Sequence, residues 1–135
     1  MKKIFLLSFI LMTMLLGACS FSVKNTWVLE KDRIAEASDV ESYAKRLQND
    51  KVDFRGYKVL TISEGKKMIV VSTGSNDKTL EFMKADVSDN STTISIKEKN
   101  KKSDEKNSFI LIGINEIKGK LKVVNQNGDE FIGGE

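Results

Sequence analysis

Six short segments rich in β-branched residues dominate the chain after residue 56, and they constrain its fold more than any other feature. Turn signals such as Glu64-Gly65 and Asp89-Asn90 separate the segments. Apolar residues recur with a period close to two, which is typical of strands. We therefore predict strands over 57–63, 67–73, 79–87, 92–98, 108–114 and 120–125.

A single helix is predicted before these strands, over about 39–50. Its apolar residues recur at i, i+3, i+4 and i+7 and form one stripe. Ser38-Asp39-Val40-Glu41 has the pattern of a capping box, in which the serine oxygen accepts from the N–H of Glu41. The stripe consists of Val40, Tyr43, Ala44 and Leu47.

Together these elements predict an α+β fold in which one N-terminal helix packs on a mainly antiparallel sheet of about six strands, a sheet that could close into a half-barrel. Segments 69–71 and 110–112 are apolar on both faces, so they are expected to be central. Asn127-Gly128 is the strongest hairpin signal, because both residues tolerate positive φ. It should pair 120–126 with 129–132.

The N-terminus has the layout of an export signal. Lys2 and Lys3 precede an apolar stretch over 4–16 that is too short for a comfortable transmembrane helix, and small residues follow it. Residues 16–19 resemble the bacterial lipobox, and all four positions fit: Leu16, Gly17, Ala18 and Cys19. The resemblance implies a diacylglyceryl group on the Cys19 thiol and cleavage just before it. Two alternatives are an uncleaved anchor and a plain secretory signal with an accidental cysteine.

This interpretation divides the chain into a signal peptide over 1–18, a short tether over 19–26 and one α+β domain over 27–135. Only seven residues separate Cys19 from Trp27, and they reach at most ~25 Å when extended. Two acyl chains hold a protein stably on a bilayer. The domain is therefore expected on the extracytoplasmic face of the cell membrane and close to it, with any protein partner nearby.

Composition excludes several kinds of chemistry. The chain has no histidine and one cysteine, so it contains no Ser-His-Asp or Cys-His unit and no intramolecular disulfide. Without Lys2 and Lys3 the 22 basic residues become 20, which against 19 acidic residues leaves a net charge of +1. A nearly neutral domain without aromatic–basic interleaving gives no argument for nucleic acid.

The succession MIVVSTG, TISIKEK and SFILIGI, within 57–125, resembles the C-terminal domain of the bacterial PrcB family. The resemblance implies a small exported domain that binds and stabilises proteases. That family usually has a Thr-Gly-Gly-Tyr-type turn after its first strand. Here only Thr73-Gly74 is kept, followed by Ser75-Asn76.

Weighed individually, the remaining candidates favour structural roles. Residues 86–91 are rich in oxygen atoms but lack the spacing of a calcium loop. Glu81 is expected to face outward from a strand, and Ser103-x-x-Lys106 lies in a polar loop over 99–107 without an apolar wall. Trp27 and Tyr43 could anchor an interface, although core packing is the default. We predict no catalytic residue, metal site or cofactor.

The leading hypothesis is a membrane-anchored binding or accessory module for another envelope or exported protein. The alternative is an inhibitor or immunity lipoprotein that acts against a protease, a wall hydrolase or phage. An enzyme that uses carboxylates or serine alone ranks last. The abundance of lysine and asparagine without proline suits a low-GC Gram-positive host.

Overall fold

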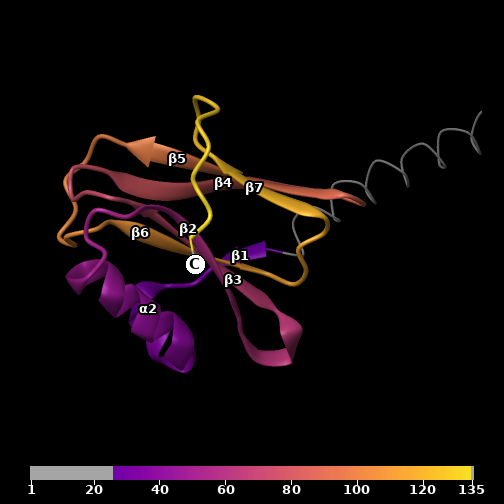
Figure 1. Cartoon of the computed structure of the whole chain (residues 1–135), viewed down its shortest axis with the longest axis horizontal. Helices are drawn as coiled ribbons and strands as arrows, with labels where there is room; N and C mark the ends of the chain where they lie inside the picture. Colours follow the sequence, from indigo (N-terminus) through magenta and orange to yellow (C-terminus); the bar gives the residue numbers. More distant parts are fainter. Residues whose placement is uncertain (1–25, 135) are drawn as a thin grey trace, which may run out of the picture.

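A computed structural model describes residues 26–134, which form three layers: helix α2 (Ser38–Asn49), a four-stranded sheet and a three-stranded sheet (Figure 1). Within these residues no helix is both long and apolar enough to cross a bilayer. The other elements are β1 (Thr26–Val28), η1 (Lys31–Glu36, 3₁₀), β2 (Arg55–Thr61), η2 (Ser63–Gly65, 3₁₀), β3 (Lys67–Thr73), β4 (Thr79–Ser88), β5 (Ser91–Lys99), β6 (Phe109–Ile114) and β7 (Lys120–Val124).

The strands are divided between two sheets rather than joined in one. The four-stranded sheet has the order β1-β6-β3-β2 and is antiparallel throughout, and the three-stranded sheet has the order β4-β5-β7. In the second sheet β5 pairs antiparallel with β4 and parallel with β7. The predicted α+β class and the mainly antiparallel pairing are confirmed. The prediction of a single sheet was wrong, and the strands within residues 26–134 form no closed barrel.

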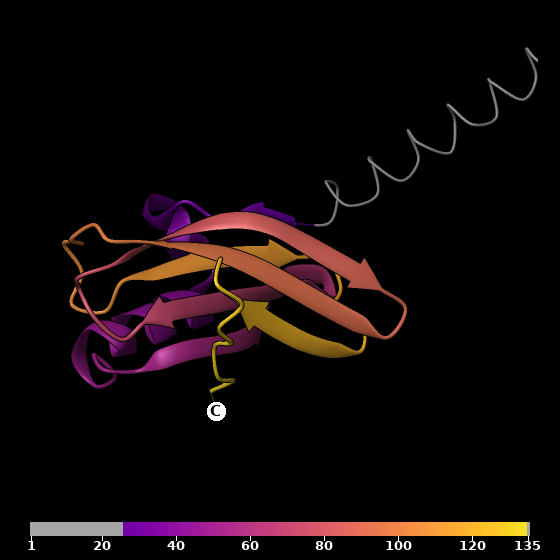
Figure 2. The same cartoon turned by 90° about the horizontal axis from the view of Figure 1, so that it is seen from above.

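Strands β3 and β6 are central in the four-stranded sheet, as predicted, and both of their faces are buried. Met68, Val70 and Leu111 face helix α2, whereas Ile69 and Ile112 face the three-stranded sheet. Because side chains alternate along a strand, one continuous apolar run supplies two separate cores. The two-sided run is therefore the cause of the three layers, which are stacked from top to bottom in Figure 1, whereas Figure 2 looks down on them from the side of the three-stranded sheet.

Helix α2 buries the predicted stripe of Val40, Tyr43, Ala44 and Leu47 against β3 and β6. The predicted capping box is wrong. The helix begins at Ser38, its N-cap is Ala37, and no side chain caps it; the Glu41 N–H donates to the Ala37 carbonyl at 3.0 Å. Burial of the stripe, rather than a local capping signal, sets the start of this helix.

Tyr43 supplies a stability prediction, because its ring is buried and its hydroxyl has no hydrogen-bond partner within residues 26–134. A buried polar group without a partner is destabilising. We expect Tyr43→Phe to raise the free energy of unfolding by about 0.5–1 kcal/mol, measured by urea denaturation at pH 7. A less stable variant would contradict this account.

The same residue gives a pH dependence. Burial raises the pKa of the Tyr43 phenol above its usual value of 10.0, and the nearby Arg46 charge opposes that shift only in part. Below pH 10 the phenol is neutral in both states. As the pH rises further, the unfolded phenol ionises before the folded one, so wild-type stability falls. We expect the stability gap between Tyr43→Phe and wild type to widen above pH 10.

The C-terminal segment departs from the predicted hairpin. Gly128 has a φ of 85°, and the Asn125 side chain caps the turn by accepting from the N–H groups of Asn127 and Asp129, each at 2.9 Å. However, only one isolated bridge, Val124↔Glu130, continues the pairing with β7. The chain then crosses to β2, where Tyr57 and Gly133 form a parallel bridge. The predicted pairing of 120–126 with 129–132 is therefore confirmed only next to the turn, and the chain leaves β7 after Phe131, whose ring packs between the sheets.

Candidate binding grooves beside β1

Strand β1 lies at the edge of the four-stranded sheet and follows directly from the predicted tether. The indole of Trp27 lies over Gly113, the one position of β6 without a side chain. The Leu29 N–H donates to the Leu111 carbonyl at 3.0 Å, which shows that the odd-numbered residues of this segment form the hydrogen bonds to β6. Hence Thr26 and Val28 direct their backbone N–H and C=O groups away from β6.

A first groove, the helix-side groove, lies between β1, the start of α2 and the β2–β3 hairpin, with a volume of about 480 Å³. Its apolar wall contains Trp27, Leu29 and Ile62, and Arg33 and Asp39 contribute polar groups. Arg33 forms an ion pair with Glu36 at 3.1 Å, so its charge is already compensated. The groove thus offers mainly apolar contact.

A second groove, the sheet-side groove, has a volume of about 470 Å³ and lies where β1 and β6 face the first residues of β4. Val28, Leu80 and Ile110 supply apolar surface. Lys31 forms an ion pair with Glu105 and lies 4.2 Å from the centre of the Phe109 ring. Glu30 and Asp32 also line the groove, so its rim carries a net negative charge.

The opposite side of the two sheets is closed by the chain itself. The segment after β7, yellow in Figure 1, spans from β7 to β2. The Phe131 N–H donates to the Val123 carbonyl at 2.8 Å and the Tyr57 N–H to the Ile132 carbonyl at 2.9 Å. Phe131 is only 4% exposed, whereas on the β1 side Val28 is 44% exposed. The space between the two sheets is therefore less covered on the side of β1 and β4 than on the side of β2 and β7.

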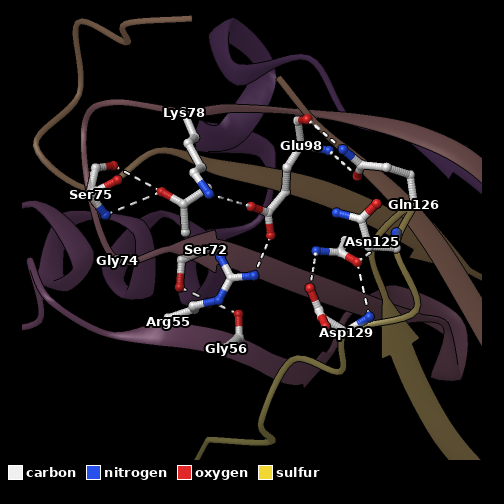
Figure 3. Close-up of polar contacts among 12 residues, drawn as sticks. Arg55, Gly56, Ser72, Gly74, Ser75, Lys78, Glu98, Asn125, Gln126 and Asp129 are labelled. Atoms are coloured by element: carbon white, nitrogen blue, oxygen red, sulfur yellow. Dashed lines mark hydrogen bonds and ion pairs between the residues drawn. The ribbon is translucent and has the colours of Figure 1, made fainter. Parts of the chain in front are cut away.

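A buried carboxylate lies near the closed side (Figure 3). Glu98 forms ion pairs with Arg55 and, at 3.4 Å, with Lys78, and its side chain is 5% exposed. Gln126 bonds to both the N–H and the C=O of Glu98 at 2.9 Å. The Arg55 guanidinium also stacks 4.5 Å from the centre of the Phe131 ring. Each charged side chain of this cluster is paired, so we assign it a structural role in holding the C-terminal segment.

That role predicts the effect of neutralising Glu98. We expect Glu98→Gln to lower the free energy of unfolding by about 1–2 kcal/mol, less than for a fully buried pair because Arg55 and Lys78 remain partly hydrated. Urea denaturation measures the change. Glu81→Gln is the matched control, since Glu81 pairs with Lys99 on the exposed face of the sheet, and its unfolding midpoint should stay unchanged. Equal effects of the two variants would contradict the assignment.

Asn107 is a structural residue that the sequence did not reveal. It was predicted as part of a solvated loop over 99–107, yet it is fully buried. Its side-chain amide donates to the carbonyls of Lys51 and Phe54, both at 2.9 Å, and its oxygen accepts from the Gly74 N–H at 2.9 Å. Gln48 bonds to its backbone N–H and C=O. Its position directly before a buried strand was the only sequence signal.

The other sequence candidates lie on a strand, a turn, a loop and the helix. Glu81 is exposed as predicted, and a hydrogen bond from Lys99 lowers the pKa of its carboxyl. Residues 86–88 end β4, Asp89 and Asn90 form the turn, and Ser91 begins β5. No group of three or more potential metal ligands occurs in the part of the chain that the structure describes. Ser103 bonds to Glu105 rather than to Lys106. Tyr43 is a core residue, but Trp27 is half-buried and lines the helix-side groove.

Four aromatic residues are divided between the two cores. Phe54 and Phe109 pack in the helix-side core, and Tyr57 and Phe82 pack against the core between the sheets. The predicted lipobox and lipid attachment site, Leu16, Gly17, Ala18 and Cys19, lie outside the described residues. The signal peptide and the tether as far as residue 25 lie outside them too.

The architecture defines a small α+β sandwich domain with two open grooves beside one edge strand. The chain belongs to the family of the uncharacterized protein YycS of Bacillus subtilis (strain 168), to which it is 48% identical over 122 residues, 87% of this chain and 86% of that protein. No established family profile matches the chain, and no solved structure matches it.

Proposed function

We propose that this protein is a lipid-anchored module on the extracytoplasmic face of the cell membrane, where it binds another envelope or exported protein. Support for the anchor comes from residues 16–19, whose sequence resembles the lipobox, and from the placement of the chain's single cysteine at that point. Support for a binding role comes from the two grooves.

The observation that carries the proposal is that β1, the strand directly after the tether, forms a wall of both grooves. Thr26 pairs with Ile114, at the same end of the sheet as Lys67. The tether spans at most ~25 Å, so an anchored domain holds this end near the bilayer. A partner in these grooves would therefore lie close to the membrane.

Photo-crosslinking in living cells tests the binding role. A photoreactive amino acid at Val28, which lines the sheet-side groove, is expected to capture a discrete protein adduct. The matched control places the same amino acid at Ile132, which is 72% exposed on the closed side. Adducts of equal yield at both positions, or none at Val28, would refute the proposed site.

The alternative function is inhibition or immunity, and it uses the same surface with a different kind of partner. A captured protease or wall hydrolase whose activity falls on binding would favour it. A deletion strain with unchanged sensitivity to proteases, wall hydrolases and phage would count against it.

A further inference from the structure

We propose that the sheet-side groove binds an extended peptide segment of a partner protein, with an apolar side chain that inserts between the two sheets and a basic residue beside it. This inference rests on the proposed binding function and specifies the chemistry of the partner. The two sides of the sandwich differ, because the C-terminal segment closes the side of β7 and β2 whereas the side of β1 and β4 has a groove.

On the closed side, the chain itself shows what fits between the sheets. The segment carrying Phe131 is extended, and its backbone bonds to Val123 in one sheet and to Tyr57 in the other. Phe131 enters the core between the sheets. A single aromatic residue on an extended backbone is thus sufficient to close this gap.

On the β1 side the corresponding place is a groove. Val28, Leu80 and Ile110 line it from β1, β4 and β6, and the last two belong to or pack against the same inter-sheet core that Phe131 completes opposite. Val28 offers outward-facing backbone N–H and C=O groups, which an added strand can use. Edge strand β4 is less suitable, because a bulge between Phe82 and Lys84 interrupts its register.

The negative charge of the sheet-side groove favours an extended segment that carries a basic residue. Glu30, Asp32 and Glu105 line the groove together with one base, Lys31, which is already paired with Glu105. Two carboxylates therefore remain to attract a partner, and a basic residue next to the inserted side chain is the complement. The chain's own tail has the opposite character, with Asp129 and Glu130 before Phe131.

The tail therefore supplies matched probes. One fluorescent peptide copies residues 127–134, a second carries Asp129→Lys and Glu130→Lys, and a third adds Phe131→Ser to the second. Fluorescence anisotropy with the membrane-extracted chain in detergent should show the lysine peptide binding at least tenfold more tightly than the acidic copy. The third peptide should bind at least tenfold more weakly than the second, because it lacks the inserted ring.

Variants of the chain locate the site. Glu30→Lys with Asp32→Lys should abolish the preference for the lysine peptide, and Val28→Asn, which removes apolar surface without adding charge, should weaken its binding at least tenfold. Ile132→Asn makes a similar change on the closed side and should leave binding unchanged. Circular dichroism verifies that all three fold.

Several outcomes would overturn the inference: equal binding to the Val28→Asn variant, no loss with Phe131→Ser, or tighter binding of the acidic copy, which would point to the tail of a second chain. A failure of the peptide chemistry can be distinguished from a failure of the proposed function. If crosslinking at Val28 captures a protein but the lysine peptide does not bind, only the peptide chemistry is wrong. If the peptide binds but no protein is captured in cells, the proposed function fails.

Discussion

Replacing Asn107 with alanine is expected to lower the free energy of unfolding by about 3 kcal/mol, although the residue lies at the end of a charged surface loop. The change removes three hydrogen bonds and leaves the Gly74 N–H and the carbonyls of Lys51 and Phe54 without this partner. Losing a buried partner costs about 1–3 kcal/mol for each group, and part of this is recovered if water enters. The loop after α2 and the loop after β3 lose their attachment to the loop before β6, whereas the bonds between Gln48 and the backbone of residue 107 remain.

Urea denaturation followed by circular dichroism measures this loss. Asn100→Ala, in the exposed part of the same loop, is the matched control and should stay near wild type. Asn107→Asp is expected to be at least as damaging as alanine, because it replaces the donating amide with a carboxylate facing two carbonyl oxygens. A variant at Asn107 as stable as Asn100→Ala would show that the loop is not held in this way.

Replacing Gly113 with alanine is expected to displace β1 from the sheet. A Cβ atom at this position would lie 2.0 Å from the Trp27 ring, so the indole must move away. Overpacking of this kind costs about 1–3 kcal/mol, and here we expect the upper end, because β1 is only three residues long and cannot compensate. Both grooves would lose their shared wall.

Trp27 is the only tryptophan, so its fluorescence reports this change directly. The Gly113→Ala variant should show a red-shifted emission together with a lower urea midpoint. Gly133→Ala serves as the control, since the nearest atom to its added Cβ is the Tyr57 hydroxyl oxygen at 3.1 Å, on a side chain that can shift. An unchanged emission in Gly113→Ala would mean that Trp27 does not pack on this glycine.

Sequence patterns predicted the elements of the fold well because short-range periodicity reflects burial. The predicted range 67–73 coincides with β3, and the stripe of α2 is buried as expected. They did not predict the division into two sheets, since pairing between distant strands, such as the parallel β5–β7 pair, leaves no local signal. The two-sided apolar runs of β3 and β6 indicated that both faces of the sheet would be covered. They did not indicate which element would cover each face.

The grooves were harder to foresee than the fold. They form where β1 ends after three residues and the chain turns into η1, so their shape depends on tertiary contacts rather than on any motif. Trp27 was the one groove residue with a sequence signal, and burial statistics favoured a core role for it. Asn107 was missed for a related reason, because its partners lie more than thirty positions away in the chain.

The anchor is the claim on which the proposed function depends, and acyl labelling tests it most directly. Cells that produce the wild-type chain or Cys19→Ala are fed an alkyne fatty acid, and both the label and the membrane fraction are measured. The account predicts a labelled, membrane-bound wild type, and a variant that loses the label and is not processed at residue 19. A variant with the same label, size and membrane fractionation as wild type would contradict it.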